Sequence, residues 1–315
     1  MKKYICFYSL MLVIITFASC RKFEKERDDG SVLIDIDEKG SLQNPAWSPD
    51  GNYLVITKFK KRYNKEPSYI LKVTLSDNSA SALVSDGSGN VNLPGSSWNG
   101  VTHKIVFSSS REPHDEIYMI DETGQPGSET KITSRSDKMA YEPSFSPDGQ
   151  WIVFESHNLD EEGNGVITKY KISGDSGYVD LTVYGEDCRQ PNWSPAGNLI
   201  LYQRFSGGCW DIWIMKTDGS DKHAVTAGTG DKTDASFSPD GNYIVYSSNE
   251  ADEDNANIFI IPSTGGTSTR VTNFKGYDGA PSWSPDGNFI VFESCPKDPD
   301  NSRGTKIYKI TAPPH

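Results

Sequence analysis

The sequence predicts an all-β fold: a six-bladed β-propeller in which each blade is a four-stranded antiparallel sheet. Three observations support this prediction. A segment that reads PAWSPDGNYLVI in its first copy recurs along the chain at intervals of 44 to 51 residues. Each copy is followed by short runs of alternating apolar residues, and Gly-containing turns separate these runs. Repeats of this period, built from short strands, are typical of propeller blades.

Each copy is aligned by one aromatic residue. The aligned aromatics are Trp47, Trp98, Phe145, Trp193, Phe237 and Trp283. Trp98 belongs to a degenerate copy, SSWNGVTHKIVFSS, which lacks the SPDG sequence. In the other copies we expect the aromatic to end an innermost strand, the SPDG-type sequence to turn the chain, and the following apolar run to form a second strand.

The third and fourth strands of the blades follow in the same order. Third strands are predicted at residues 116–121, 211–219, 257–266 and 306–310, and fourth strands at 131–134, 180–183, 224–227 and 270–273. The last unit has no fourth strand after Ile310, whereas residues 31–37 form a strand that precedes the first unit. Pairing 31–37 with the last blade would close the ring and remove an open sheet edge.

The repeated SPDG sequence has two interpretations. Its Asp and Ser residues could form a repeated active site, or they could shape a turn, because Pro, Asp and Gly each favour turn conformations. The fourth copy has Ala196 in place of the Asp and keeps the rest of the motif. We therefore interpret SPDG as a structural turn, and the aligned aromatics as packing between blades.

The N-terminal region is expected to direct and anchor the chain. Residues 1–19 combine two Lys residues with an apolar run that is short for a transmembrane helix. With Cys20 directly after Ala-Ser, they look like a bacterial lipoprotein signal, although a plain secreted protein or a membrane anchor are alternatives. Residues 20–30 then form a lipidated Cys and a charged tether, and 31–311 the propeller. We expect outer-membrane anchoring, with the leaflet open.

Composition narrows the classes of partner and chemistry. The formal net charge of −12 disfavours binding to nucleic acid. The five His residues are scattered, so no metal site is expected from their spacing. Beyond the N-terminal region there are three Cys residues, and a disulfide between Cys188 and Cys209 is an open alternative to free thiols.

The repeat resembles that of the TolB propeller family. The resemblance rests on WSPDG followed by an apolar strand, on DIWIMKTDG and its counterparts, and on the L/V-T pair that follows, and it covers about residues 31–311. It implies the propeller fold and a role in envelope integrity beside a peptidoglycan-associated lipoprotein. TolB also carries an N-terminal α/β domain, and about ten tether residues stand in its place here.

Candidate binding residues lie on the face opposite the SPDG turns. Pseudo-symmetry places the residues three positions before each aromatic, together with neighbours, around the channel mouth; the candidates are Asn44, Tyr141, Glu142, Arg189, Gln190, Asp234 and Asp278. They could be solvated rim residues, a small polar pocket, or a calcium site formed by Glu142 and Asp234. Phe205 and Trp210 are loop aromatics that could stack on a sugar or grip a peptide.

Three functions remain open at this point. The first is a non-catalytic module that binds a protein or glycan partner in the cell envelope through the channel-mouth face. The second is a TolB-like envelope scaffold. The third is a polysaccharide lyase or hydrolase with Glu142 and Asp234 as acid and base. No cofactor is expected, and the first hypothesis assigns no catalytic residue.

Overall fold

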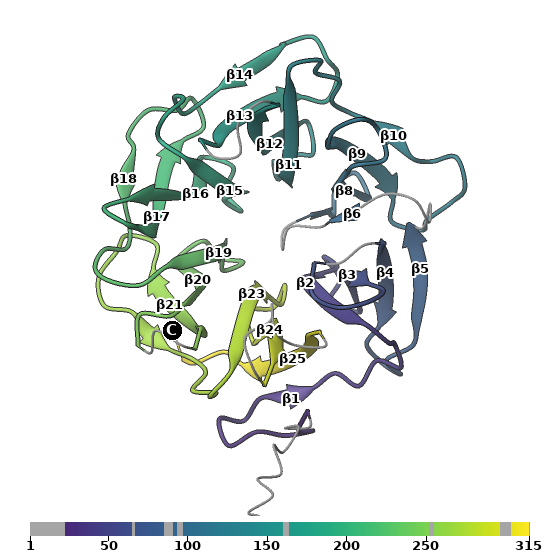
Figure 1. Cartoon of the computed structure of the whole chain (residues 1–315), viewed down its shortest axis with the longest axis vertical. Helices are drawn as coiled ribbons and strands as arrows, with labels where there is room; N and C mark the ends of the chain where they lie inside the picture. Colours follow the sequence, from purple (N-terminus) through teal and green to yellow (C-terminus); the bar gives the residue numbers. More distant parts are fainter. Residues whose placement is uncertain are drawn as a thin grey trace, which may run out of the picture.

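The structure is a computed structural model that describes residues 23–64, 67–84, 91–92, 97–159, 164–251, 255–296 and 304–314. These residues contain strands and turns but no helix. They form six antiparallel sheets arranged as a ring around a central channel, as Figure 1 shows. The predicted six-bladed propeller is confirmed.

Within each blade the strands follow one another from the channel outward. Blade one consists of β2 (Ser41–Trp47), β3 (Tyr53–Phe59), β4 (Ser68–Thr74) and β5 (Ala80–Val84). Blade two has an innermost strand in two pieces, β6 (Val91–Asn92) and β7 (Trp98–Asn99), then β8 (Lys104–Ser109), β9 (Glu116–Asp121) and β10 (Thr130–Lys131). Blade three consists of β11 (Lys138–Phe145), β12 (Trp151–Asn158), β13 (Val166–Lys171) and β14 (Tyr178–Asp180).

The second half of the ring repeats this order. Blade four consists of β15 (Cys188–Trp193), β16 (Leu199–Ser206), β17 (Cys209–Lys216) and β18 (His223–Ala224). Blade five consists of β19 (Lys232–Phe237), β20 (Tyr243–Ser248), β21 (Asn257–Pro262) and β22 (Thr269–Arg270). Blade six consists of β23 (Tyr277–Trp283), β24 (Phe289–Cys295), β25 (Lys306–Thr311) and β1 (Val32–Leu33).

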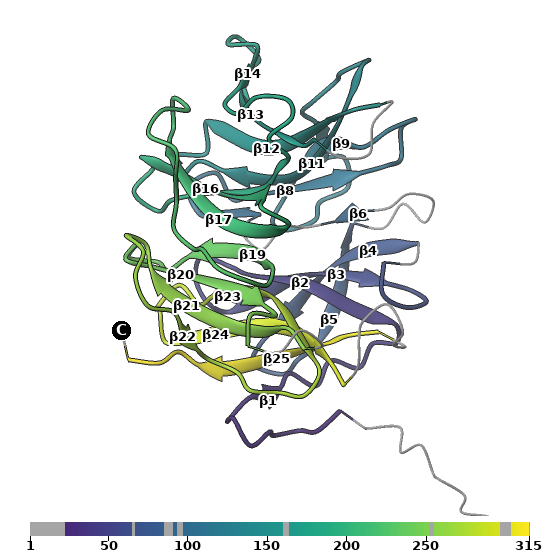
Figure 2. The same ribbon diagram turned by 60° about the vertical axis from the view of Figure 1, so that its left-hand side comes forward.

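The ring closes through the N-terminal strand. β1 pairs antiparallel with β25, with Val32 opposite Lys309, and Figures 1 and 2 both show the two strands side by side. The paired strand is shorter than the predicted 31–37. Ile34 and Ile36 lie beyond it and are buried in the core between blades six and one. The Ile34 backbone amide still donates to the Ile307 carbonyl at 2.9 Å, and burial of the two side chains adds to this contact.

The segment before β1 differs from the predicted solvated tether. Within residues 23–30, Arg27 is only 6% exposed. Its guanidinium lies 3.7 Å from the ring centroids of both Phe274 and Tyr308, and Nη1 donates to Asp278 Oδ1 at 2.9 Å. A buried carboxylate needs a partner, and Arg27 supplies it. The prediction of a tether through residue 30 is therefore wrong for this segment, which packs on blade six.

The SPDG sequence forms the predicted turn. In blade one, Ser48 Oγ donates to Asp50 Oδ1 at 2.5 Å and accepts the Tyr53 amide at 2.9 Å, while Gly51 has a φ of 73°. In blade four, where Asp is absent, Ser194 Oγ instead donates to Asn198 Oδ1 at 3.1 Å. Because each of these contacts stays within its own turn, they explain the motif as local structure.

The aligned aromatics serve the packing between blades. Phe145, Trp193, Phe237 and Trp283 are each less than 10% exposed and belong to inter-blade cores. At the turn end of the channel, the six aligned aromatics also line a cavity of about 360 Å³.

Candidate functional site

The channel-mouth half of each innermost strand contains a bulge. In five blades the pairing between the first and second strand shifts register by one residue. One residue of each bulge has a positive φ between 46° and 54°; these residues are Asn44, Glu142, Gln190, Asp234 and Ala280. We call them the bulge ring. The equivalent position of blade two, Gly95, lies outside the described residues.

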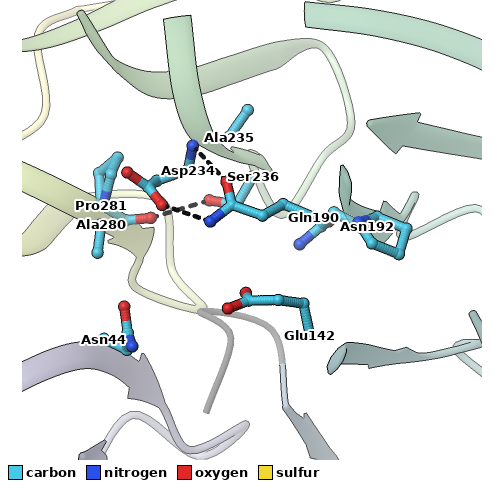
Figure 3. A pocket seen from close by; sticks show the side chains of 10 residues that line it. Asn44, Glu142, Gln190, Asn192, Asp234, Ala235, Ser236, Ala280 and Pro281 are labelled. Carbon is cyan, nitrogen blue, oxygen red and sulfur yellow. Dashed lines mark hydrogen bonds between the residues drawn. The ribbon is translucent and has the colours of Figure 1, made fainter. Parts of the chain in front are cut away.

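The bulge ring carries backbone strain at the channel mouth. A non-glycine residue in the left-handed region costs about 1–2 kcal/mol. Such strain persists where the surrounding structure enforces it, and it concentrates at functional sites. Four of the five residues have polar side chains, and Figure 3 shows those of Glu142, Gln190 and Asp234 converging on one slot. The slot has a volume of about 30 Å³, which is room for about two water molecules.

Two members of the bulge ring bond directly to each other. Gln190 Nε2 donates to Asp234 Oδ1 at 2.8 Å, and the Asp234 amide donates to Gln190 Oε1 at 3.0 Å (Figure 3). The other carboxylate oxygen of Asp234 accepts hydroxyl donors from Thr233 at 3.0 Å and Ser247 at 3.1 Å. This carboxylate is therefore held as an acceptor by neighbours, which leaves it little freedom to act as a general base.

Two further carboxylates face the channel from the second strands. The backbone amide of Asn44 donates to Glu293 Oε2 at 2.9 Å, and the backbone amide of Gln190 donates to Glu155 Oε2 at 3.0 Å. Sequence reasoning missed both glutamates. The signal was present, because each stands in the sequence VFES, as a single carboxylate directly after an apolar run. Such a residue should face either a partner or a polar channel.

The crowded carboxylates bind protons unusually well. Burial, followed by the negative charges of Glu155 and Asp234, raises the pKa of Glu142 to about 8. Burial is also the main cause that raises the pKa of Glu293 to about 8. The hydrogen bond from the Asn44 backbone amide partly offsets this rise, because it stabilises the charged form. The slot therefore favours a proton or a cationic group over an anion.

A second, larger cavity opens beside the slot between blades three and four. Its volume is about 660 Å³, and its lining includes the predicted residues Tyr141, Glu142, Arg189 and Gln190. The predicted loop aromatics stand at its edge. Arg189 Cζ lies 5.0 Å from the Trp210 ring centroid, and the Phe205 and Trp210 rings are 5.3 Å apart. The structure thus brings most of the predicted channel-mouth residues together.

Asp278 does not belong to this group. Its side chain is fully buried, lines neither cavity, and accepts from Arg27 and Ser294. The prediction of a ligand-binding role at the channel mouth is wrong for this placement, because the N-terminal segment already occupies the carboxylate.

Of the two alternatives left open for Cys188 and Cys209, a disulfide or free thiols, the structure has the free thiols. Cys188 is opposite Arg204 and points into the blade-four core, whereas Cys209 is opposite Ser206 at the tip of the β16–β17 hairpin. Burial raises the pKa of the Cys188 thiol to about 12, which makes it unreactive as a nucleophile.

The described residues contain no group of three or more His, Cys, Asp or Glu side chains that could hold a metal ion. In the same part of the chain, no helix is long and apolar enough to cross a membrane. Cys20 and the predicted signal sequence lie outside the described residues.

Comparison with known proteins places this architecture. Residues 28–254 match the family model described as TolB beta propeller domain. The chain belongs to this family. It is 26% identical over 218 residues to an uncharacterised protein of Agrobacterium fabrum, a match that spans 67% of each chain. It is 33% identical over 173 residues to the Tol-Pal system protein TolB of Francisella tularensis subsp. holarctica, a match that spans 55% of this chain and 38% of that TolB.

Solved structures show the same fold. A putative TolB from Agrobacterium tumefaciens superposes with a TM-score of 0.62 at 20% identity, over 87% of this chain and 91% of that one. An oligogalacturonate lyase in complex with manganese superposes with a TM-score of 0.59 at 17% identity, over 90% and 80% of the two chains. At these identities the likeness extends to the fold alone.

Proposed function

We propose that this chain is a non-catalytic binding scaffold of the cell envelope, which engages a protein partner through the channel-mouth face. The observation that carries the proposal is the bulge ring. Five blades hold their innermost strand in a strained conformation, and four of these strands aim a polar side chain at the channel. Strain kept in this way at one mouth is typical of a recognition site.

Family membership supports a protein as the partner. The resemblance to TolB implies an envelope scaffold that docks a peptidoglycan-associated lipoprotein, and the Francisella relative is named for the Tol-Pal system. The match spans only 38% of that relative, so we also argue the partner of the present chain from the chemistry of the slot. The slot favours a protein surface that offers a cationic side chain to Glu142 and Asp234.

The arrangement of the two carboxylates favours binding over catalysis. Glu142 could serve as a general acid, because its raised pKa keeps a proton near neutral pH. Asp234 would have to be the base, but donors from Gln190, Thr233 and Ser247 already engage it. A lyase or hydrolase that uses Glu142 as the acid and Asp234 as the base is the alternative function.

Affinity purification of the full-length protein from its native envelope tests the proposal. The ring variant is Glu142→Gln with Asp234→Asn. The control is Asp240→Asn in the blade-five turn, where the Asp240 carboxylate accepts from Ser238 and Asn242 of the same turn. We expect wild type and control to recover the same protein, and the ring variant to recover less than about a tenth as much. Equal recovery by the ring variant, or no recovered protein with wild type, contradicts the proposal.

The catalytic alternative needs its own assay. Wild type and ring variant are incubated with acidic and neutral polysaccharides, and new reducing ends or unsaturated sugars are measured. The scaffold proposal expects no turnover by either protein. Turnover by wild type that disappears in the ring variant would establish the enzyme instead.

A further inference from the structure

The larger cavity at the channel mouth has the features of a ligand site of its own. It lies between blades three and four and has a volume of about 660 Å³. Its walls are formed by Met139, Tyr141, Glu142, Glu155, His157, Arg189, Gln190 and Gln203. Every lining side chain except Met139 is polar, and four strands contribute them. The slot beside it has a volume of only about 30 Å³, enough for water or one small cationic group and too small for a ring-shaped ligand.

Gln203 is the residue that shows the cavity to be incomplete. Its side chain is 7% exposed, and its Oε1 atom is buried with no hydrogen-bond partner among the described residues. A buried acceptor left in this state costs about 1–3 kcal/mol, so native proteins seldom keep one without a reason. Gln203 stands directly opposite Arg189 in the β15–β16 ladder, at the back of the cavity. A turn of the Gln203 amide toward the cavity would let a ligand donor satisfy this oxygen.

The other polar groups are held in place before any ligand arrives. Arg189 donates to both oxygens of Asp187, at 2.9 Å and 3.1 Å, and its guanidinium lies over Trp210. His157 Nε2 lies 2.5 Å from Glu155 Oε1, and both side chains are buried. Pre-organised groups of this kind lose little entropy when a ligand binds.

The balance of charge decides which ligand class fits. Arg189 is neutralised by Asp187, and His157 is paired with Glu155, so the cavity has no surplus positive charge to select an anion. Donors and acceptors instead alternate around the wall, beside the ring of Tyr141, which packs edge-on against His157 at 5.6 Å. Neutral ligands with many hydroxyl groups and one apolar face match that lining.

We propose that the cavity between blades three and four binds a neutral saccharide of one or two rings. A hydroxyl of the sugar donates to Gln203 Oε1, and another accepts from Arg189. The apolar face of the ring packs on Tyr141. The cavity shares Glu142 and Gln190 with the bulge ring, so the face of the propeller that is proposed to dock a protein would also contact a glycan.

Calorimetric titration of the full-length protein tests this proposal. The probes are glucose, galactose, mannose, N-acetylglucosamine, maltose and cellobiose, in a buffer free of sugar-based detergents. We expect saturable binding of at least one probe with a dissociation constant below about 10 mM. Absence of saturable binding across the panel overturns the proposal.

Three variants locate the binding. Gln203→Leu keeps the volume of the side chain and removes the unpartnered oxygen, so the fold should be at least as stable. Arg189→Met keeps most of the stem that packs on Trp210. The control is Ser108→Ala, which changes the position equivalent to Gln203 in blade two, away from the cavity.

The expected result is a loss of at least tenfold in affinity for Gln203→Leu and for Arg189→Met, with unchanged affinity for the control. Thermal unfolding of each variant shows whether the fold is intact. Folded variants that bind as tightly as wild type would place the saccharide elsewhere and overturn the assignment.

Discussion

Both faces of the disc contain backbone positions with a left-handed conformation, but the two faces place different kinds of residue there. On the turn face, the left-handed position of each SPDG-type turn is a glycine, for example Gly51 and Gly287, and the carboxylate beside it is solvent-exposed and locally bonded. On the channel-mouth face, the left-handed positions are Asn44, Glu142 and their equivalents. Of the carboxylates there, Glu155 and Glu293 are buried, and Glu142 and Asp234 are half-buried. One face minimises its conformational cost, whereas the other accepts strain and buried charge.

This difference separates a face held by local contacts from the face that we propose for recognition. The turn face repeats the SPDG-type turn, with glycine at its left-handed position, in nearly every blade. The mouth face varies from blade to blade and is supported by long-range contacts, such as that between Asn44 and Glu293. Substitutions should therefore have small, similar effects on the turn face and large, position-specific effects on the mouth face.

The largest effect is expected at the buried ion pair of Arg27 and Asp278. Arg27→Met leaves the Asp278 carboxylate buried without its cation, which should lower the free energy of unfolding by about 3–5 kcal/mol. Adding Asp278→Asn should restore much of that loss, because the buried charge is gone. Denaturant unfolding measures both; a loss under about 1 kcal/mol would mean that the N-terminal segment is dispensable.

The two faces should also respond to pH in opposite directions. Glu293 has a folded-state pKa of about 8, above its unfolded value, so its contribution is fully present below the unfolded pKa and is lost as pH rises through 8. The Ser284 hydroxyl lowers the pKa of Asp286, so its contribution is present above the unfolded pKa and is lost as pH falls below about 4. Stability should be greatest in weakly acidic solution.

Variants separate these two limbs of the stability curve. Glu293→Gln should remove at least ~2 kcal/mol of the decline in unfolding free energy between pH 5 and pH 8. Asp286→Asn should flatten part of the acid limb and leave the alkaline limb unchanged. An alkaline limb as steep in Glu293→Gln as in wild type would show that Glu293 does not contribute to it.

Exchanging alanine and glycine within blade six compares the two kinds of left-handed position. Gly287→Ala should destabilise the protein by about 1–2 kcal/mol, because Gly287 has a φ of 75°. An added Cβ would meet open space, so the cost is backbone strain and not a clash. Ala280→Gly should be within about 0.5 kcal/mol of wild type, because relief of strain offsets the added freedom of the unfolded chain. Equal destabilisation by both changes would contradict the claim that the backbone at Ala280 is strained.

The smallest effect is expected in the blade-four turn. Ala196→Asp restores the missing SPDG carboxylate and should stabilise the protein by about 0.5 kcal/mol, a rise of about 1–2 °C in melting temperature. Calorimetry of the variant beside wild type measures the shift. A drop in melting temperature would show that Asn198 already fulfils the role of the Asp.

The sequence predicted the features that depend on local chemistry. The six-blade count, the SPDG turns and the closure by the N-terminal strand all follow from short motifs and their spacing. The contact of Arg27 with Asp278 joins residues 251 positions apart, and nothing in the charged run around Arg27 announces it. The choice between a disulfide and free thiols stayed open for a related reason, since loop position alone does not say which way the Cys188 side chain points.

The candidate site was only partly predictable. Pseudo-symmetry identified the bulge ring, because a repeated backbone places equivalent residues at equivalent points. It could not show that these residues are strained, nor that Glu155 and Glu293 lie beside them, since both depend on the bulge in the neighbouring strand. The unpartnered oxygen of Gln203 appears only once the surrounding side chains are in place.

Photo-crosslinking from each face in the native envelope tests the central claim most directly. A photoreactive phenylalanine analogue replaces Phe205 on the mouth face in one protein and Asn242 on the turn face in another; both positions are exposed. The account predicts a crosslinked protein partner from position 205 and none from position 242. A partner captured from position 242 but not from 205 would contradict it.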